Sequence, residues 1–447
     1  MENFSWECRT KVKFGQGCVR EHLAEFVKEF AKDSAEGFAG GAGEPAGSGR
    51  RNVMVGYGGG SVKKNGSYDD VMAVLKELGY TAAPDADTEA DSAETGAGQI
   101  VEFGGIMSNP TLAKMQEGAE LARRHNIGLI IAIGGGSVMD CCKAIAVQAY
   151  YGGDAWEDFW MQGKPMTHEI IPCGVVVTMP ATGSEVNGCA VLTNEETRIK
   201  CDRDYPEMNP AFALMDPAYT LTMPIRQLRA GTFDILSHIM ETYFSYPLYG
   251  NPADDTSEGL MRGLIRDFRA ALSNPHDMQA RSNIMWCASL AENRIIKTGK
   301  TKDFQVHNME HQLSAYTNCN HGEGLAVLHP AYYRHIYKDG LPKFVSFAVN
   351  VWGIDPMEFA DSSQGAQPGA DNPQSACTAE ERIALAGIDA LESFIAECGL
   401  PTTLRDLGFG ETEQELLPEI AESCFISQGA FRPLDAKEIL EIYSECW

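Results

Sequence analysis

Short apolar runs that end in glycine alternate with helical patterns through the first half of the chain. Residues 51–60 (RNVMVGYGGG) and 127–140 (IGLIIAIGGGSVMD) are runs of this kind. Residues 109–126 repeat apolar side chains with the helical period, and Asn109 and Pro110 are a start signal for that helix. Strands that alternate with helices predict an α/β fold with a parallel sheet covered by helices.

The second half of the chain shows helical patterns without convincing strands from about Pro224 onward. We therefore predict an α/β domain over residues 1–222 and an all-helical domain over residues 223–447. The expected helices of the second domain lie within 226–245, 257–273, 282–296, 304–316 and 379–399.

Composition limits the partners and the compartment. The formal net charge of −26 repels phosphate backbones and anionic membrane surfaces, so we expect no nucleic-acid partner and no membrane partner. No stretch approaches the roughly 20 apolar residues that a membrane span needs, and the N-terminus lacks a signal-peptide pattern. The 13 cysteines show no C-x-x-C spacing, which indicates reduced thiols and a cytoplasmic protein.

Three segments have the composition of surface insertions. Residues 33–49, 83–98 and 361–376 are rich in Gly, Ala, Ser and acidic residues and poor in large apolar side chains. Such segments bury too little surface to offset their ordering entropy, so we expect flexible loops there.

Two glycine-rich strings follow apolar strands, GYGGGSVKKNG at 56–66 and IGGGSVMDCCK at 133–143. Glycine lets backbone N–H groups approach an anion closely, and a helix N-terminus beyond the loop adds partial positive charge. Neither string has the G-x-G-x-x-G spacing of the common dinucleotide fingerprint. Two such loops at strand ends nevertheless favour binding of a dinucleotide pyrophosphate.

The first loop bears on the choice between NADP(H) and NAD(H). Sites specific for NAD place a carboxylate near the ribose 2′-hydroxyl. Here the loop offers no acidic residue, so we expect NADP(H) to be preferred over NAD(H); its residues are Gly58, Gly59, Gly60 and Ser61, followed by Lys63 and Lys64. A third loop offers the hydroxyls of Thr178, Thr182 and Ser184 after another strand, where capping is an alternative role.

Acidic and imidazole side chains in the helical half have the spacing of metal ligands. Asp234 and His238 are four residues apart, so both project from one helix face. His307 and His311 share a second helix face, and His321 lies ten residues beyond. One carboxylate and up to three imidazoles suit a single divalent ion such as Fe²⁺ or Zn²⁺. Spacing alone leaves all three later histidines as alternatives, and helix geometry favours the pair that shares a face.

Seven strings in order make the chain resemble the iron-containing (group III) alcohol dehydrogenases, and among them the NADPH-dependent butanol dehydrogenases. The strings are YGGGSVKKNG, FGGIMSNP, AIGGGSVMDCCKAIA, ATGSEVNG, DPAYTLTMP, GTFDILSHIMETY and HNMEHQLSAYTNCNHGEGLAV. The resemblance implies a Rossmann-like dinucleotide-binding domain, a helical C-terminal domain, an active site in the cleft between them, and a homodimer. The adjacent Cys141 and Cys142 and the three insertions depart from the family pattern.

The resemblance also implies roles for individual residues. Its metal ligands correspond to Asp234, His238, His307 and His321. His311 corresponds to a histidine beside the metal and the nicotinamide that is not a regular ligand, and is our candidate catalytic residue. Cofactor contacts correspond to Gly58, Gly59, Gly60, Ser61, Gly135, Gly136, Ser137, Asp140, Thr178, Thr182 and Lys200.

The function implied by the resemblance is reversible hydride transfer between a nicotinamide and a primary alcohol or aldehyde, such as butanol or butanal. One alternative is a glycerol dehydrogenase-like or dehydroquinate synthase-like relative, which the GGGSVKKNG string and the spacing of the last three histidines disfavour. Another alternative is a non-redox metal-dependent hydrolase or lyase, which has no need of dinucleotide binding.

Overall fold

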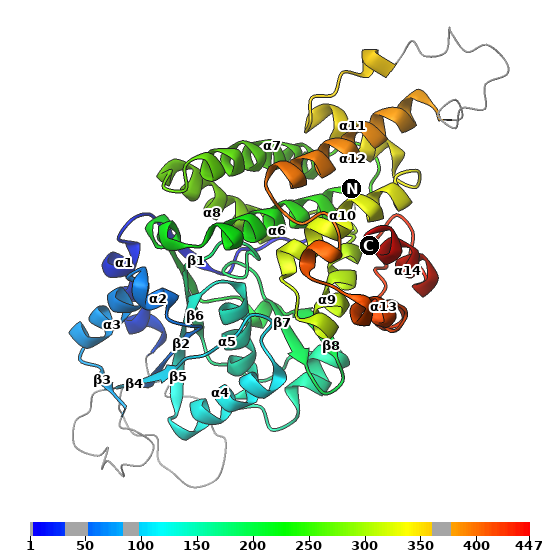
Figure 1. Ribbon diagram of the computed structural model, residues 1–447. Helices are drawn as coiled ribbons and strands as arrows, with labels where there is room; N and C mark the ends of the chain where they lie inside the picture. Colours follow the sequence, from blue (N-terminus) through cyan, green and yellow to red (C-terminus); the bar gives the residue numbers. More distant parts are fainter. Residues whose placement is uncertain (1–2, 32–51, 84–97, 360–376) are drawn as a thin grey trace, which may run out of the picture. The chain divides into compact units, whose positions relative to one another are not determined.

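The computed structural model describes residues 3–31, 52–83, 98–359 and 377–447 (Figure 1). The chain divides into two compact units, Glu7–Met223 and Pro224–Trp447, and the residues up to Trp6 belong with the second unit. Trp6 explains that exception, because its indole Nε1 donates a hydrogen bond to the carbonyl oxygen of Asn293, at 3.1 Å. The expected loops at 33–49 and 361–376 lie outside the described residues, and so do residues 84–97 of the expected loop at 83–98.

The first unit contains a parallel sheet of seven described strands in the order β1-β9-β6-β5-β2-β4-β3. All eight residues of the central strand β5 are buried, which is why its sequence is an unbroken apolar run. The strands are β1 (Lys11–Phe14), β2 (Asn52–Tyr57), β3 (Thr81–Ala82), β4 (Gln99–Phe103), β5 (Ile127–Gly134), β6 (Cys173–Val177) and β9 (Phe212–Met215).

Helices cover both faces of this sheet (Figure 1). On one face Val53 and Val55 join a core with residues of α1 and α3, in which the rings of Phe26 and Phe212 stack at 4.6 Å. Gly56 points to the other face, where a Cβ would lie 2.4 Å from Cys142 Sγ of α5. The helices of this unit are α1 (Cys18–Phe30), α2 (Ser61–Lys64), α3 (Ser67–Glu77), α4 (Leu112–Arg124) and α5 (Gly136–Gln148), with a π-helical segment at Trp156–Met161.

Several details of the first unit differ from the sequence-based expectation. The N-cap of α4 is Thr111, whose side chain accepts a hydrogen bond from Lys114 N at 3.2 Å, so Asn109 and Pro110 precede the helix and do not open it. The helix after the second glycine loop begins at Gly136, so residues 136–140 of the run 127–140 are helical and do not continue the strand. An antiparallel hairpin of β7 (Cys189–Asn194) and β8 (Ile199–Asp204) was not expected.

The second unit is helical over its described residues, with no strand among them (Figure 1). Helices α6, α7, α8, α9 and α12 lie where helical patterns were expected, whereas α10, α11, α13 and α14 are additional. The bounds are α6 (Ile225–Tyr243), α7 (Pro252–Ser273), α8 (Met278–Glu292), α9 (Gln305–Thr317), α10 (His321–Ile336), α11 (Leu341–Asn350), α12 (Ala379–Glu397), α13 (Glu411–Ser423) and α14 (Ala436–Glu445). In the described part of the chain, no helix has the length and apolar character that a membrane span requires.

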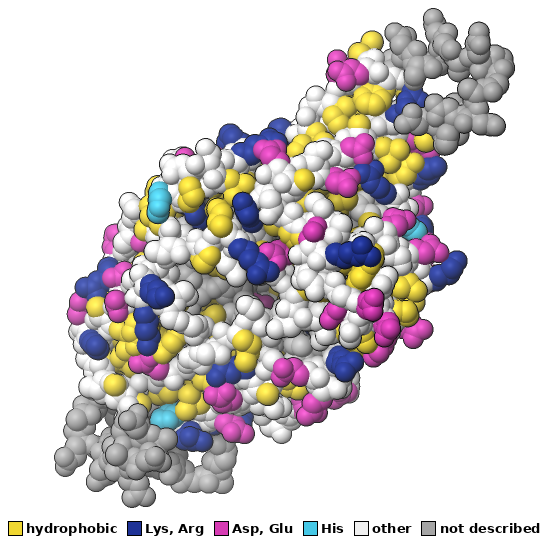
Figure 2. Space-filling model, viewed as in Figure 1, with side chains coloured by type: hydrophobic (Ala, Val, Ile, Leu, Met, Phe, Trp, Pro, Cys, Tyr) yellow, Lys and Arg dark blue, Asp and Glu magenta, His cyan; other side chains and the backbone are white. Residues whose placement is uncertain are grey.

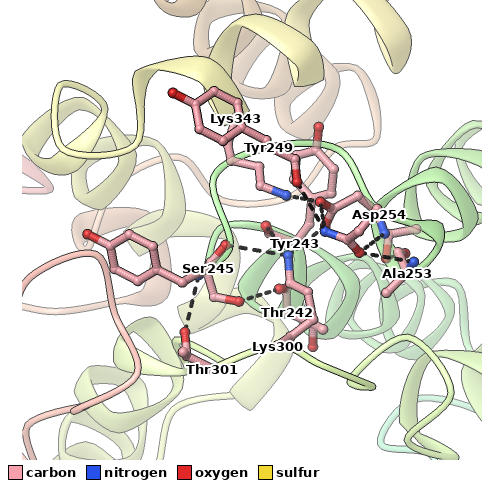
Figure 3. Close-up of polar contacts among 12 residues, drawn as sticks. Thr242, Tyr243, Ser245, Tyr249, Ala253, Asp254, Lys300, Thr301 and Lys343 are labelled. Atoms are coloured by element: carbon pink, nitrogen blue, oxygen red, sulfur yellow. Dashed lines mark hydrogen bonds and ion pairs between the residues drawn. The ribbon is translucent and has the colours of Figure 1, made fainter. Parts of the chain in front are cut away.

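A buried ionic cluster joins three parts of the helical unit (Figure 3). Asp254, in the first turn of α7, pairs with Lys300 and with Lys343 of α11. The side chains of the two lysines are only 1% and 2% exposed. Lys300 Nζ also donates to the carbonyl oxygens of Tyr243 at 3.0 Å and Ser245 at 3.4 Å. One carboxylate therefore pairs with two buried lysine side chains and ties the segment before α9 to α7.

Acidic and basic side chains are interspersed over the face of the molecule shown in Figure 2.

Candidate metal centre and cofactor loops

Helix α6 supplies the first pair of candidate metal ligands. It is buried almost throughout from Leu228 to Tyr243, so the polar side chains in this stretch lie inside the helical unit. Asp234 is 2% exposed, and its Oδ1 atom lies 3.7 Å from Nδ1 of His238, one turn later. A carboxylate and an imidazole on one buried helix face need a partner that offsets their desolvation.

Helices α9 and α10 bring two further imidazoles to the same carboxylate oxygen. Helix α9 ends before Asn318, which has a left-handed φ of 54°, and Asn320 caps α10 by accepting a hydrogen bond from Glu323 N. This tight connection makes His321 the first residue of α10. Asp234 Oδ1 lies 3.6 Å from Nε2 of His307 and 3.6 Å from Nε2 of His321.

Gly322 permits the close approach of α10 to α6. A Cβ at this position would lie 2.2 Å from the carbonyl oxygen of Ala230, closer than nonbonded atoms come. Because that oxygen belongs to the backbone of a buried helix, it cannot move aside. Glycine at 322 therefore places His321 against Asp234.

Asp234, His307 and His321 offer ligand atoms that all lie within 4.8 Å of one another, as a divalent metal ion requires, and His238 approaches the same carboxylate from one helix turn away. Asp234 Oδ1, His238 Nδ1 and His307 Nε2 are buried and have no hydrogen-bond partner among the described residues, which is costly unless a ligand occupies the space that they face. Four ligands about 2.1 Å from an ion at the corners of a tetrahedron lie about 3.4 Å apart. The observed separations of 3.6 and 3.7 Å around Asp234 Oδ1 are close to that value. Three imidazoles and one carboxylate suit Fe²⁺ or Zn²⁺.

Two buried glutamates that the sequence analysis missed form a second layer around this centre. Glu241 Oε2 is hydrogen-bonded to Nδ1 of His307, and Glu310 Oε2 to Nδ1 of His321. The side chains of both glutamates are 0% exposed. The available sequence signal was an H-x-x-E spacing, because each glutamate follows a histidine of the centre by three residues. That spacing did not reveal the partners, since Glu241 contacts a histidine of another helix.

The electrostatics of the centre favour a bound cation. Burial raises the pKa of Asp234, but the imidazoles of His238, His321 and His307 outweigh it and hold this pKa below its usual value. Burial lowers the pKa of His307, whereas Glu241 and Asp234 raise it, to about 10. Without an ion His307 therefore holds a proton, which supplies the positive charge that the surrounding carboxylates require. A divalent ion replaces that proton and supplies more charge.

His311 lies beside the four side chains just described. It is 5% exposed, and its ring centroid is 5.5 Å from that of His321 and 6.1 Å from that of His307. A nitrogen of His311 also lies within 4.8 Å of ligand-type atoms of Glu310 and His321. The structure thus brings His307, His311 and His321 close together. The group of possible metal ligands that contains Asp234 includes His307 and His321 but not His311. The division into ligands and catalytic neighbour stays a prediction.

The second glycine loop forms the N-terminus of α5 at the carboxyl end of the central strand β5 (Figure 1). Gly135 precedes the helix, and Gly136 and Ser137 open it. A Cβ on Gly136 would lie 2.5 Å from Cγ2 of Thr182, so the third loop packs directly on this turn. Thr178 N donates to Gly134 O at 2.9 Å. These predicted contact residues therefore gather at a helix N-terminus, where an anion is stabilised.

Asp140 and Lys200 are buried, with exposures of 5% and 3%. Asp140 Oδ1 accepts a hydrogen bond from Ser184 Oγ at 2.6 Å, and Oδ2 accepts one from Val191 N at 3.1 Å. Lys143, which was not predicted, joins the same network by donating to Ser184 Oγ at 2.7 Å. Asp140 therefore ties α5 to the loop and hairpin that follow β6. Lys200 lies on β8 opposite Thr193.

The first glycine loop, Gly58, Gly59 and Gly60, connects β2 directly to the short helix α2, which begins at Ser61. Lys63 Nζ lies 4.6 Å from the ring centroid of Tyr68 and 4.0 Å from Oε2 of Glu102 on β4. The loop itself has no acidic residue, but an acidic side chain from the neighbouring strand thus comes near it. Lys64 is exposed.

Comparison with known proteins identifies the family. The model of the iron-containing alcohol dehydrogenases matches residues 86–217, and that of the C-terminal region of this family matches residues 229–447. The chain is 33% identical over 449 residues to NADH-dependent butanol dehydrogenase A of Clostridium acetobutylicum, with all of both chains covered. It is 32% identical to the NADPH-dependent aldehyde reductase YqhD of Escherichia coli, with 94% of each covered.

Solved structures of similar proteins have the same fold as this chain. The crystal structure of NADH-dependent butanol dehydrogenase A from Thermotoga maritima has a TM-score of 0.81 at 29% identity, covering 100% of this chain and 99% of that one. Escherichia coli YqhD has a TM-score of 0.79 at 28% identity, with the same coverage. The resemblance inferred from the sequence strings is therefore confirmed, and the chain belongs to the iron-containing alcohol dehydrogenase family.

Proposed function

We propose that this protein is a metal-dependent, NAD(P)H-linked alcohol dehydrogenase or aldehyde reductase that transfers hydride reversibly between a nicotinamide and a primary alcohol or aldehyde. The observation that carries the proposal is the convergence of three imidazole nitrogens on Asp234 Oδ1 at 3.6–3.7 Å. Family membership and relatives that include butanol dehydrogenases and an aldehyde reductase support the reaction class.

Asp234, His238, His307 and His321 hold one divalent ion, Fe²⁺ or Zn²⁺, in this proposal. When bound, such an ion supplies Lewis acidity to the substrate oxygen and so stabilises the charge that develops there. The four side chains would hold that ion and so determine where its Lewis acidity acts. Hydride transfer then requires the nicotinamide carbon and the substrate carbon to approach within about 3–3.5 Å.

His311 is assigned the catalytic role of orienting the substrate or relaying its proton, because an imidazole donates and accepts protons near neutral pH. Its ring lies 5.5 Å from that of His321, close enough to reach a substrate at the centre. Replacing it, His311→Ala, should lower kcat while leaving about one metal ion per chain. If His311→Ala loses the metal, then His311 is a ligand and this assignment is wrong.

The unit Glu7–Met223 is assigned the dinucleotide-binding role and the unit Pro224–Trp447 the metal-binding role. The pyrophosphate is assigned to Gly135, Gly136 and Ser137 at the N-terminus of α5. The remaining predicted contacts, Thr178, Thr182, Asp140 and Lys200, complete the cofactor site, Asp140 by holding the surrounding loops.

For the choice of cofactor we propose NADP(H) over NAD(H), since residues 58–64 offer two lysines and no acid. Relatives do not decide between them, because one similar butanol dehydrogenase is NADH-dependent and YqhD is NADPH-dependent. Glu102, 4.0 Å from Lys63 Nζ, partly neutralises that lysine and limits the preference. Lys63→Ala should raise KM for NADPH and leave KM for NADH nearly unchanged. Equal effects on both cofactors would remove this explanation.

The reaction class is tested with anaerobically purified protein. Oxidation of NADPH and NADH is followed with butanal, with other short aldehydes and, in reverse, with butanol, 1,3-propanediol and glycerol. The proposal predicts aldehyde reduction that chelation abolishes and added Fe²⁺ or Zn²⁺ restores. Activity on glycerol alone would favour the glycerol dehydrogenase-like alternative, and absence of NAD(P)H binding would favour a hydrolase or lyase. A cytoplasmic homodimer is part of the proposal and is tested by light scattering and cell fractionation.

A further inference from the structure

Glu241 and Glu310 occupy equivalent positions behind two histidines of the metal centre. We propose that these glutamates are positioning residues that select which imidazole nitrogen faces the ion, and that they thereby set how tightly the metal is retained. The inference rests on the proposed metal-binding function and deepens it. Its basis is the hydrogen bonding of the two carboxylates to His307 and His321.

Glu241 is held in one orientation. Its Oε1 atom accepts hydrogen bonds from the backbone N–H groups of Val306, at 2.7 Å, and His307, at 3.4 Å. These are N–H groups of the first turn of α9, so the carboxylate also caps that helix. Because Oε1 is hydrogen-bonded to these backbone N–H groups, Oε2 is the oxygen that contacts His307 Nδ1.

The hydrogen bond to Glu241 determines the tautomer of His307 in the metal-bound state. An ionised carboxylate only accepts hydrogen bonds, so Nδ1 must carry the proton. Nε2 then keeps its lone pair and points toward Asp234 Oδ1, 3.6 Å away. The buried carboxylate also increases the basicity of the ring, which strengthens the bond of Nε2 to a cation.

Glu310 repeats this arrangement for His321. Its Oε2 atom contacts Nδ1 of that ring, while Oε1 lies 3.9 Å from Sγ of Cys319. Gly324 leaves the space for it, because a Cβ there would lie 2.9 Å from Cγ of Glu310. Nε2 of His321 therefore faces Asp234 Oδ1 at 3.6 Å, as Nε2 of His307 does.

His238 provides a contrast within the same centre. The atom that it directs toward Asp234 Oδ1 is Nδ1, at 3.7 Å, and not Nε2. The two histidines that present Nε2 are thus the two whose Nδ1 is held by a buried glutamate. The agreement between glutamate contact and choice of nitrogen is what the positioning role requires.

The substitution Glu241→Gln tests the role by reversing the hydrogen bond. The amide oxygen can keep the contact with Val306 N, which leaves the NH₂ group to face His307 Nδ1. An amide NH₂ donates, so Nδ1 must accept and the proton moves to Nε2, where it blocks the metal-facing atom. Shape and size hardly change, yet the tautomer needed for metal binding is disfavoured.

Metal affinity is measured on metal-free full-length protein by Zn²⁺ titration against a competing chelator. Removal of a partner of this kind weakens metal binding by about 10–100-fold. We expect an increase of that size in Kd for Glu241→Gln and for Glu310→Gln, and faster loss of Zn²⁺ to EDTA. The second variant keeps the test decisive if the first does not fold, since His321 lies nearer the surface, with its side chain 23% exposed.

Glu258→Gln is the matched control. Glu258 is also a buried glutamate of the helical unit, but it accepts hydrogen bonds from Tyr243 Oη at 2.8 Å and Asn350 Nδ2 at 3.0 Å and touches no histidine of the centre. Its replacement should leave Kd for Zn²⁺ within twofold of the wild-type value. The melting temperature of each metal-free variant shows whether the helical unit is intact.

The outcomes separate this inference from the function on which it rests. Wild-type Kd values in folded Glu241→Gln and Glu310→Gln proteins would overturn the positioning role and leave the metal site in place. Equal weakening by Glu258→Gln would also overturn it, because any buried carboxylate would then have the same effect. Failure of the wild-type protein to bind Zn²⁺, Fe²⁺ or Co²⁺ would instead overturn the proposed function, and the inference with it.

Discussion

Replacing Asp254 by asparagine should destabilise the helical unit strongly at neutral pH. This carboxylate pairs with both Lys300 and Lys343, whose side chains are 1% and 2% exposed (Figure 3). Asparagine keeps the shape of the side chain but removes its charge. The two buried lysines then lose the carboxylate that pairs with both, and Lys300 keeps its hydrogen bonds to the carbonyl oxygens of Tyr243 and Ser245.

Two arguments give the size of the effect. Removing one partner of a buried ion pair costs about 3–5 kcal/mol. Alternatively the lysines lose their protons, which costs about 4–5 kcal/mol at pH 7 for a lysine of ordinary pKa. Burial and the charge of Lys343 lower the pKa of Lys300 to about 7 even with Asp254 present, so its neutralisation adds little. We therefore expect Asp254→Asn to lower the free energy of unfolding by about 4 kcal/mol at pH 7.

The loss of unfolding free energy in Asp254→Asn should become smaller as pH rises, because the folded variant and the folded wild type bind different numbers of protons. The unfolded chain keeps both lysines protonated up to about pH 10, whereas the folded variant binds fewer protons than the folded wild type. Between pH 7 and 9 the difference in unfolding free energy between wild type and variant should fall by about 1.4 kcal/mol per pH unit. This applies to each lysine that is neutral in the folded variant but protonated in the folded wild type.

Urea denaturation followed by far-UV circular dichroism, at pH 7 and pH 9, measures both quantities. Asp255→Asn is the control, because Asp255 is the exposed neighbour on the same helix and should change stability by less than about 0.5 kcal/mol. A loss below about 1 kcal/mol at pH 7 for Asp254→Asn, or a loss that grows toward pH 9, would refute the reasoning.

Three further predictions concern the approach of helices, a buried acid and the cofactor loop. Gly322→Ala should destabilise the protein by about 1–3 kcal/mol and weaken metal binding, because its Cβ would lie 2.2 Å from Ala230 O. The control Gly259→Ala, on an exposed face of α7, should change neither stability nor metal binding. Equal effects of the two substitutions in melting and metal analysis would contradict this explanation. Burial and Glu241 raise the pKa of Asp303 to about 8, so the metal-free protein should lose stability as pH rises from about 4 to 8. Asp303→Asn should flatten that slope in urea denaturation, and an unchanged slope would exclude Asp303 as its source. Gly136→Ala should weaken NADPH binding in a fluorescence titration, since its Cβ would lie 2.5 Å from Thr182, and unchanged affinity would argue against pyrophosphate binding there.

The sequence predicts the parallel sheet because its central strands are buried on both faces. The run 127–134 is apolar throughout and all of it is buried, so its sequence pattern matches its burial in the folded protein. Strand β1, with its sequence KVKF, is partly exposed and too short and polar to be distinguished from a loop. Helix α10 was missed because Gly322, Gly324 and Pro330 interrupt its pattern. Only its contacts with Ala230 and Glu310 explain the two glycines.

The candidate centre is predictable to the extent that its residues share a helix. The pair Asp234 and His238 follows from i,i+4 spacing on α6, and the structure places them together. The approach of His321 depends on the turn at Asn318 and on Gly322, which spacing does not reveal. Glu241 is a similar case, because an acidic residue near a helix end looks like surface charge until the partner helix is known.

Metal analysis of the wild-type protein and of Asp234→Asn tests the central claim most directly, because Asp234 Oδ1 is the atom on which three imidazole nitrogens converge. Both proteins are purified anaerobically, loaded with Fe²⁺ or Zn²⁺, desalted and measured by mass spectrometry of the elements. The account predicts about one ion per chain in the wild type and nearly none in a folded Asp234→Asn protein. Full metal occupancy in that variant, or none in the wild type, would contradict it.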